Sequence, residues 1–119
     1  MKTLIMNKYG KEHPMTFELN SYVDNGNLYV GLITHEEGYP APWSNLTVNL
    51  GVKCDADCAF IDINNNGSEI IAWLIANDLG FPTGYIKPSG FCVYPEFRFN
   101  MDILMQYVKE GDNANEILC

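Results

Sequence analysis

The stretch that decides the fold is residues 59–94, AFIDINNNGSEIIAWLIANDLGFPTGYIKPSGFCVY. Its order of residue types predicts a short buried strand, an asparagine-rich turn, a helix, and then a loop dense in glycine and proline. It contains no phosphate-binding glycine loop and no G-x-S-x-G turn around a serine nucleophile. The most distinctive part of the chain therefore predicts architecture and a contact surface, and not reaction chemistry.

The helix within this stretch has clear boundary signals. Asn66 is a good N-cap residue, and Glu69 three positions later completes a capping-box pattern. An apolar stripe follows at residues 70–75, Gly80 is placed as a C-terminal cap, and Pro82 prevents continuation. We therefore expect a helix over residues 67–79.

Two segments combine aromatic side chains with glycine or proline. One is the loop expected at residues 80–90, GFPTGYIKPSG, and the other is residues 39–43, YPAPW. Rigid loops lose little entropy on binding, and aromatic residues are favoured anchors in protein recognition. The predicted partner-binding surface consists of Tyr39, Trp43, Phe81, Tyr85 and Ile86. The alternative is that these side chains only cover the ends of the core.

The N-terminal half shows the alternation of β-strands. Apolar residues occupy every second position in residues 15–20 and 45–50, and a shorter run occurs at residues 4–6. Residues 27–34 are apolar on both faces, which is typical of a central strand. The turn Asp24-Asn25-Gly26 is the strongest hairpin signal, and short connections favour an antiparallel meander. The polar face of this sheet should expose Thr16, Glu18, Asn45, Thr47, Asn49 and Arg98.

The C-terminal part adds a strand and a second helix. Phe97 and Phe99 alternate with polar residues, and Asn100 then caps a segment with the apolar spacing of an amphipathic helix. We expect this helix over residues 100–110 and a loose tail over residues 111–119.

The predicted fold class is α+β, a mainly antiparallel sheet with two helices packed on one face. At 119 residues and 47% hydrophobic, the chain is long enough to bury a core. We expect a single domain over residues 1–110. Its core should bury Trp73, Leu74, Phe97 and Leu104.

Charge and hydropathy exclude several classes of protein. The net charge is −8, which repels phosphate backbones, so we expect no direct binding of DNA or RNA. No run approaches the roughly 20 apolar residues that a membrane helix needs, and the first residues lack a secretory core. We therefore expect a cytoplasmic protein that does not associate with membranes.

Metal and cofactor signals are weak, and we expect no bound cofactor. The cysteines, at positions 54, 58, 92 and 119, lack common zinc spacing and are expected as free thiols. A zinc set of Cys54, Cys58, Cys92 and His35 is the alternative. Residues 62–67, DINNNG, match the opening of a calcium loop, but its twelfth position holds Trp73 where a glutamate is required. The preferred interpretation is a turn in which asparagine side chains bond the local backbone.

Five short segments occur in one order along the chain: LTVNL at 46–50, AFID at 59–62, NNN at 64–66, LGFPTG at 79–84 and SGFCVYP at 89–95. In this order they resemble an uncharacterised family of short acidic bacterial proteins, a domain of unknown function. The resemblance extends over residues 1–108. Such proteins are often encoded on plasmids and conjugative elements of gut anaerobes, so the resemblance implies a mobile-element context. It implies no activity and no catalytic residues.

Three functional hypotheses follow. The first is a non-enzymatic, protein-binding accessory factor of a bacterial mobile element, whose acidic surface favours a basic partner. The second is a counter-defence inhibitor that imitates the charge of nucleic acid, which requires carboxylates arrayed along one face. The third is a cysteine-dependent enzyme that uses Cys92 or Cys58, although neither His13 nor His35 has a context that suggests a paired base.

Overall fold

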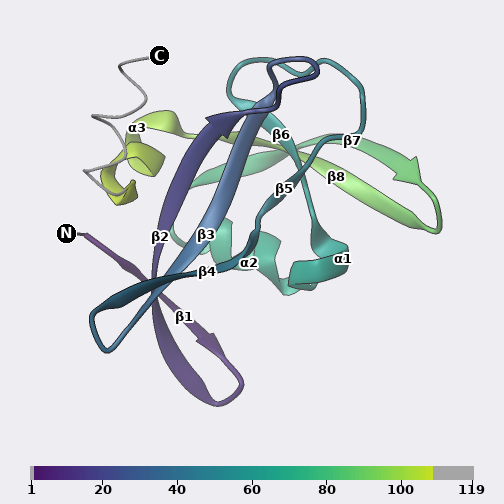
Figure 1. Ribbon diagram of the computed structural model, residues 1–119. Coiled ribbons are helices and arrows are strands. Elements are labelled where there is room, and N and C mark those ends of the chain that lie inside the picture. Colours follow the sequence, from purple (N-terminus) through teal and green to yellow (C-terminus); the bar gives the residue numbers. More distant parts are fainter. Residues whose placement is uncertain (1, 109–119) are drawn as a thin grey trace.

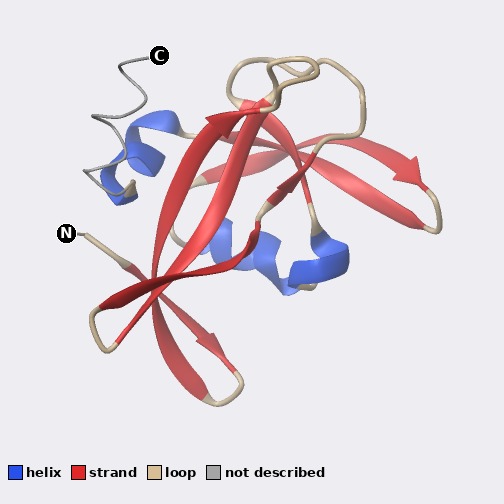
Figure 2. Ribbon diagram, in the orientation of Figure 1, coloured by secondary structure: helices blue, strands red, loops and turns tan. Residues whose placement is uncertain are grey.

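Two four-stranded antiparallel sheets form the body of the protein, as a computed structural model that describes residues 2–108 shows (Figure 1, Figure 2). The first sheet has the order β1-β2-β3-β4 and is the meander predicted from its short turns. Its strands are β1 (Leu4–Lys8), β2 (Lys11–Ser21), β3 (Leu28–Glu36) and β4 (Tyr39–Asn45).

The second sheet has the order β5-β6-β8-β7, so its neighbouring strands are not all consecutive in sequence. Its strands are β5 (Thr47–Val48), β6 (Cys58–Ile61), β7 (Gly80–Ser89) and β8 (Cys92–Phe99). Helices α1 (Ile63–Asn66) and α2 (Glu69–Ala76) connect β6 to β7, and α3 (Met101–Leu104) follows β8. The predicted fold class, α+β and mainly antiparallel sheet, is confirmed.

The sequence predicts one sheet, whereas the strands divide into two. The division falls directly after β4, where the Leu46 N–H donates to the Val30 carbonyl oxygen at 2.9 Å. At the next residue the hydroxyl of Thr47, and not a backbone carbonyl, accepts the Val30 N–H at 3.1 Å. The side chain thus replaces the next ladder bond, and β5 pairs with β6 instead.

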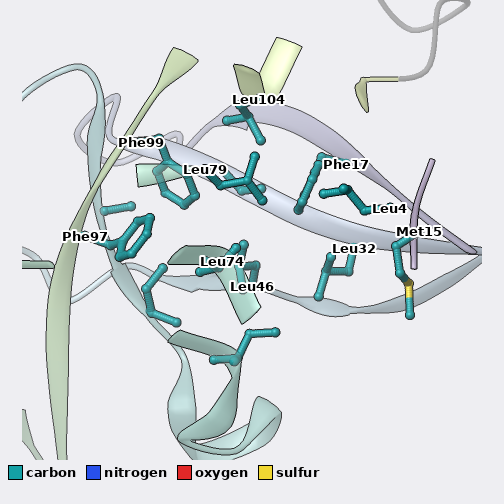
Figure 3. Packing of buried hydrophobic residues seen from close by; sticks show 14 of the residues in the cluster. Leu4, Met15, Phe17, Leu32, Leu46, Leu74, Leu79, Phe97, Phe99 and Leu104 are labelled. Atoms are coloured by element: carbon teal, nitrogen blue, oxygen red, sulfur yellow. The ribbon is translucent and has the colours of Figure 1, made fainter. Parts of the chain in front are cut away.

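Side chains from both sheets and from the helices meet in one core (Figure 3). Leu74, Phe97 and Leu104 are fully buried, as predicted. The prediction that Trp73 belongs to the buried core was wrong, because its indole is only half-buried. Its Nε1–H donates a 2.9 Å hydrogen bond to the carbonyl oxygen of Ile5 at the edge of β1. A tryptophan with one apolar side and one polar contact suits such a boundary position.

The helix boundaries also differ from those that the sequence predicts. Asn66 is the last residue of α1 and is buried, while Asp62 is the N-cap and its carboxylate accepts a backbone N–H of the first turn. Gly67, at φ 83°, separates α1 from α2, so the helix expected over residues 67–79 is shorter. Asp78 takes the left-handed conformation at φ 62°, which aspartate tolerates, and Gly80 already belongs to β7.

Both aromatic segments that the sequence predicts as loops are edge strands. Residues 39–43 belong to β4, and residues 80–89 form β7, which pairs with β8 in an antiparallel hairpin. Their prolines suggest loops, but one side of an edge strand makes no ladder bonds and tolerates residues without an N–H. The prolines therefore mark the edges of the two sheets.

The predicted polar face is only partly exposed. Glu18 and Asn45 are exposed as expected, whereas Thr16 and Thr47 are buried. The hydroxyl oxygen of Thr16 lies 2.7 Å from Nε2 of His35, and that of Thr47 accepts a backbone N–H. Internal hydrogen bonds satisfy both hydroxyls, so their burial carries little penalty.

The final helix ends earlier than the predicted residue 110. Asn100 caps α3 as predicted, and a 3-10 turn at Met105–Tyr107 leads to Val108, which forms a parallel bridge with Phe17. Residues 109–119, including the predicted tail, lie outside the described residues. Between residues 2 and 108 no helix has the length and apolar character needed to span a membrane.

Candidate functional site

A β-bulge in the edge strand β4 places Trp43 out of the normal alternation. Leu32 pairs with Ser44, but the next residue, Ile33, pairs with Pro42, so Trp43 has no partner on β3. A bulge interrupts the ladder and re-aims a side chain, and bulges are common at sheet edges and beside functional sites.

Two contacts show where the bulge directs the side chains. The Trp43 ring lies 4.8 Å from the ring of His13, and Ser44 Oγ donates to Oδ1 of Asn66 in α1 at 2.6 Å. Two successive residues of β4 therefore face the core side of the sheet. The Trp43 ring also lies 6.4 Å from that of Tyr9 in the β1–β2 turn.

These side chains border a groove of about 480 Å³, here called the Trp43 groove. Its walls are the end of β1 with the β1–β2 turn, the end of β4, and the helices α1 and α2. Figure 1 shows how β4 runs from the β3–β4 turn toward these helices. The volume falls within the range of about 300–1,000 Å³ that is usual for ligand sites. The lining residues are Met6, Asn7, Lys8, Tyr9, Trp43, Ser44, Asn65, Asn66, Glu69, Ile70 and Trp73.

A neutralised pair of charges lines the groove. Lys8 Nζ lies 3.3 Å from Glu69 Oε2 and donates to the Asn66 carbonyl oxygen, also at 3.3 Å. The pKa of Glu69 is lowered first by a hydrogen bond from its own backbone N–H and then by Lys8. The described walls of the groove therefore offer a ligand aromatic surface and hydrogen-bonding groups, but no isolated charge.

The free edge of β1 borders the same groove. Lys8 and Lys11 flank a two-residue turn and so form a hydrogen-bonded pair, which makes the preceding pair, at Asn7, a non-hydrogen-bonded one. The N–H and C=O of Asn7 consequently face away from β2. The alternation agrees with Ile5, two residues earlier, whose outward carbonyl accepts the bond from Trp73.

A polar cluster fixes the His13 ring against which Trp43 packs. His13 Nδ1 lies 2.7 Å from Glu36 Oε2, and its Nε2 lies 3.1 Å from the carbonyl oxygen of Lys8. Thr34 donates to the same Glu36 oxygen at 2.6 Å. The hydrogen bond from Thr34, followed by that from His13, lowers the pKa of Glu36 to about 2. The ring against which Trp43 packs is thus fixed at both nitrogens.

The structure does not bring the five predicted binding residues to one surface. Trp43 lies in the groove, and Tyr39, 77% exposed, begins β4 at the β3–β4 turn. Phe81, Tyr85 and Ile86 are exposed on β7 of the second sheet, whose far end lies across the molecule from that turn in Figure 1. The single surface assumed from the sequence is not formed, and a binding role for either half stays a prediction.

Tyr85 packs over a second, smaller core. Its ring lies 5.9 Å from that of Phe60, which forms a separate buried cluster with Cys54 and Cys58. This contact supports the alternative that some of the aromatic residues cover the core.

Sequence reasoning missed most of the Trp43 groove. It assigned Trp73 to the core and named neither Lys8 nor Tyr9 as a binding residue. No spacing in the sequence connects the three segments that line the groove. They meet only because β1 pairs with β2 and β4 pairs with β3, and because α1 and α2 pack beside these strands.

Within residues 2–108, one group of side chains has the geometry to hold a metal ion: Asp55, Asp57 and Cys58. Arg98 already binds both carboxylates, with nitrogen–oxygen distances of 3.0 Å to Asp55 and 2.6 Å to Asp57. The guanidinium supplies the positive charge that a metal ion would supply. His35 of the hypothetical zinc set lies in the first sheet and is not part of this group.

The calcium-like segment DINNNG is a strand-to-helix connection. The Asp62 carboxylate accepts from the N–H and the side-chain amide of Asn65, at 3.2 and 2.8 Å. The Asn66 amide donates to the carbonyl oxygens of Asn45 and Asp62, each at 2.9 Å. Three of these bonds stay within the segment and two of them involve its backbone, in line with the preferred interpretation of the sequence, while the fourth connects the segment to Asn45 at the end of β4.

Two of the thiols are poorly suited to nucleophilic chemistry. Burial raises the pKa of Cys54 to about 11 and that of Cys58 to about 12. Catalytic thiols have lowered pKa values, because the thiolate is the nucleophile.

Comparison with known proteins assigns the chain to a family. The chain belongs to the family described as Domain of unknown function (DUF4313), which matches residues 16–117. The match includes β4, α1 and α2 of the Trp43 groove, whereas β1 precedes it. No curated protein and no solved structure gives a significant match.

Proposed function

We propose that the protein is a non-enzymatic, protein-binding accessory factor that takes an extended segment of its partner in the Trp43 groove. One observation carries the proposal: the bulge in β4 sets Trp43 opposite a stretch of β1 whose outer side pairs with no strand of the part of the chain that the structure describes. The resemblance to proteins of plasmids and conjugative elements supports a mobile-element context.

The edges of the two sheets differ in how well they are protected. Edge strands β4 and β7 each contain two prolines, and edge strand β5 has only two residues. Proline and short length are common ways to prevent unwanted strand pairing. Edge strand β1 has neither protection, and the outward N–H and C=O of Asn7 can pair with an extended peptide.

The groove also favours binding energetically. A buried tryptophan anchor commonly contributes about 2 kcal/mol or more to a protein interface. Because the polar cluster already fixes the His13 ring against which Trp43 packs, little ordering entropy is lost on binding. The net charge of −8 steers the protein toward a basic partner.

Two alternatives receive less support. A nucleic-acid mimic needs a dense array of free carboxylates, but Glu36, Glu69, Asp55 and Asp57 each pair with a cationic side chain. A cysteine-dependent enzyme needs an activated thiol, and the raised pKa of Cys58 opposes this role.

Selection of phage-displayed random peptides on the immobilised protein tests the proposal. We expect enriched peptides whose affinity, measured by calorimetry, falls at least about tenfold in Trp43→Ala. Trp43→Phe should retain part of the affinity, which guards against simple misfolding of the alanine variant. Tyr85→Ala is the matched control on the other predicted surface and should bind normally.

The backbone of a selected peptide provides a second test. Antiparallel strand addition predicts that N-methylation weakens binding at the peptide residue facing Asn7 but not at its direct neighbours, because in an antiparallel pair the facing residues exchange both hydrogen bonds. Loss of affinity in Tyr85→Ala but not in Trp43→Ala would move the binding surface to β7. Failure to enrich any peptide would contradict the proposal.

A further inference from the structure

A second hollow lies on the face of the first sheet that points away from the core. It has a volume of about 240 Å³ and is here called the Glu18 hollow. Its main walls are Glu18 of β2, Tyr29 and Ile33 of β3, and Pro40 and Pro42 of β4. The strand register and the alternation of side chains place these residues on one face.

The glycine opposite Glu18 makes room for the aromatic wall of the hollow. Glu18 pairs with Gly31, and the Tyr29 side chain lies across that glycine, so that an added Cβ would be 2.5 Å from the Tyr29 hydroxyl. The same hydroxyl donates to Asn45 Oδ1 at 2.7 Å, and the ring makes an edge-on contact with Tyr22 at 5.7 Å. The aromatic wall is therefore held in place before any ligand binds.

Of the residues that the structure describes, Glu18 is the one charged residue that lines the hollow, and it is exposed. Its carboxylate makes no ion pair or hydrogen bond within residues 2–108, unlike those of Glu36 and Glu69. Its charge still reaches Tyr29, whose pKa is raised first by burial and then by Glu18. One unpaired negative charge beside apolar walls is complementary to a single cation on an apolar stem.

We infer that the Glu18 hollow receives an arginine side chain of the partner segment, an inference that rests on the proposed function. The aliphatic stem of the arginine covers Ile33, Pro40 and Pro42, as the stems of long basic side chains do on apolar surface. Its guanidinium donates charge-assisted hydrogen bonds to Glu18 and stacks against the Tyr29 ring. Arginine suits this hollow better than lysine, because its planar group makes both contacts at once.

The Trp43 groove and the Glu18 hollow lie close enough for one partner to fill both. Trp43 and Ser44 line each of them, so only the edge strand β4 separates the Trp43 groove from the Glu18 hollow. A segment that crosses β4 therefore places one residue against Trp43 and an arginine against Glu18.

Small probes test the hollow independently of any partner. N-acetyl-arginine amide and its uncharged isostere, N-acetyl-citrulline amide, are titrated into the isotope-labelled protein and followed by NMR. The arginine probe should shift the amide resonances of Gly31 and Ile33. We expect at least about fivefold weaker binding of the citrulline probe, and of the arginine probe to Glu18→Gln. Glu12→Gln removes an exposed carboxylate from the same strand outside the hollow and should leave binding unchanged.

The outcomes separate this inference from the proposed function. Equal binding of the two probes, no binding of the arginine probe, or no effect of Glu18→Gln overturns the arginine site. Peptide binding that depends on Trp43 would still support the proposed function in each of these cases. Charge-selective binding of the arginine probe without any peptide binding would support the site and overturn the groove as a peptide-binding site.

Discussion

Trp43 owes its position to one extra residue in β4, and no pattern in its neighbourhood predicts this. The sequence YPAPWSN indicates a rigid aromatic segment, which is correct, but it does not indicate which way the indole points. The register shift between Leu32 and Ile33 decides that direction. At the scale of single residues, titration and reactivity give two further tests.

Cys54 and Cys58 should react slowly with thiol reagents in the folded protein. Burial raises their pKa values to about 11 and about 12, so little thiolate is present near neutral pH. Alkylation at about pH 8, resolved by peptide mass spectrometry, should be at least about tenfold slower at both sites than in denatured protein. Rapid modification of Cys58 in the native protein would contradict this and restore thiol chemistry as a hypothesis.

Glu36 should stabilise the fold at neutral pH and lose this effect in acid. Hydrogen bonds, first from Thr34 and then from His13, lower its pKa from 4.5 to about 2. Since the folded state binds the proton more weakly than the unfolded state, the stabilisation is complete above the unfolded pKa of 4.5 and disappears as the pH falls toward 2. The melting temperature of Glu36→Gln should therefore fall less steeply than that of the wild type across this window. If the melting temperatures of the two proteins fall in parallel with pH, Glu36 does not contribute to this stabilisation.

At the scale of elements, the hairpin β7–β8 depends on a glycine at its first residue. Gly80 has a φ of 143°, and an added Cβ would overlap the carbonyl oxygen of Arg98 on β8. Gly84 also has a positive φ, 95°, but its Cβ position is open. Substitutions at Gly80 and Gly84 therefore distinguish the effect of backbone strain, which both positions share, from the effect of close packing, which only Gly80 has.

Gly80→Ala should lower the free energy of unfolding by at least about 2 kcal/mol more than Gly84→Ala, because only the first forces β7 away from β8. Urea unfolding of both variants measures the difference. Equal losses would mean that the backbone conformation alone requires glycine at these positions.

At the scale of the whole molecule, the two sheets share one core. Val30 and Leu32 of the first sheet, Ile61 and Phe97 of the second, and Leu74 of α2 belong to the same buried cluster. Burial of apolar side chains is the main stabilising contribution to folding, and neither sheet can bury its apolar face alone.

We expect both sheets to unfold in a single transition. Leu74→Ala should lower the free energy of unfolding by about 2–5 kcal/mol. Hydrogen exchange should show this loss equally for amides of β2 and β3 and for amides of β6 and β8. Two separate transitions, or a loss confined to the second sheet, would divide the chain into two folding units. Ile75→Ala, at a neighbouring but exposed position of α2, is the control. It should lower the free energy of unfolding by much less than Leu74→Ala does.

Features that act over a few residues could be predicted from the sequence. The turn residues predict the meander of the first sheet, Asn100 predicts the cap of α3, and apolar periodicity predicts the burial of Leu74 and Leu104. Prediction failed where two local interpretations compete. Prolines are common both in loops and on edge strands, so β4 and β7 were indistinguishable from rigid loops until their pairing partners were known.

The sequence by itself determined the fold class, the predominance of antiparallel strands and a core that includes Leu74, Phe97 and Leu104, because turn chemistry and hydrophobic periodicity are local properties. Only the tertiary structure decided the division into two sheets, the bulge that turns Trp43 toward His13, and the two hollows on either side of β4. Each of these depends on how strands pair, either within a hairpin of consecutive strands, as for the bulge between β3 and β4, or between segments farther apart in the sequence. Register is set by the sum of many pairings and by competition for backbone hydrogen bonds, as where Thr47 replaces a ladder bond of Val30.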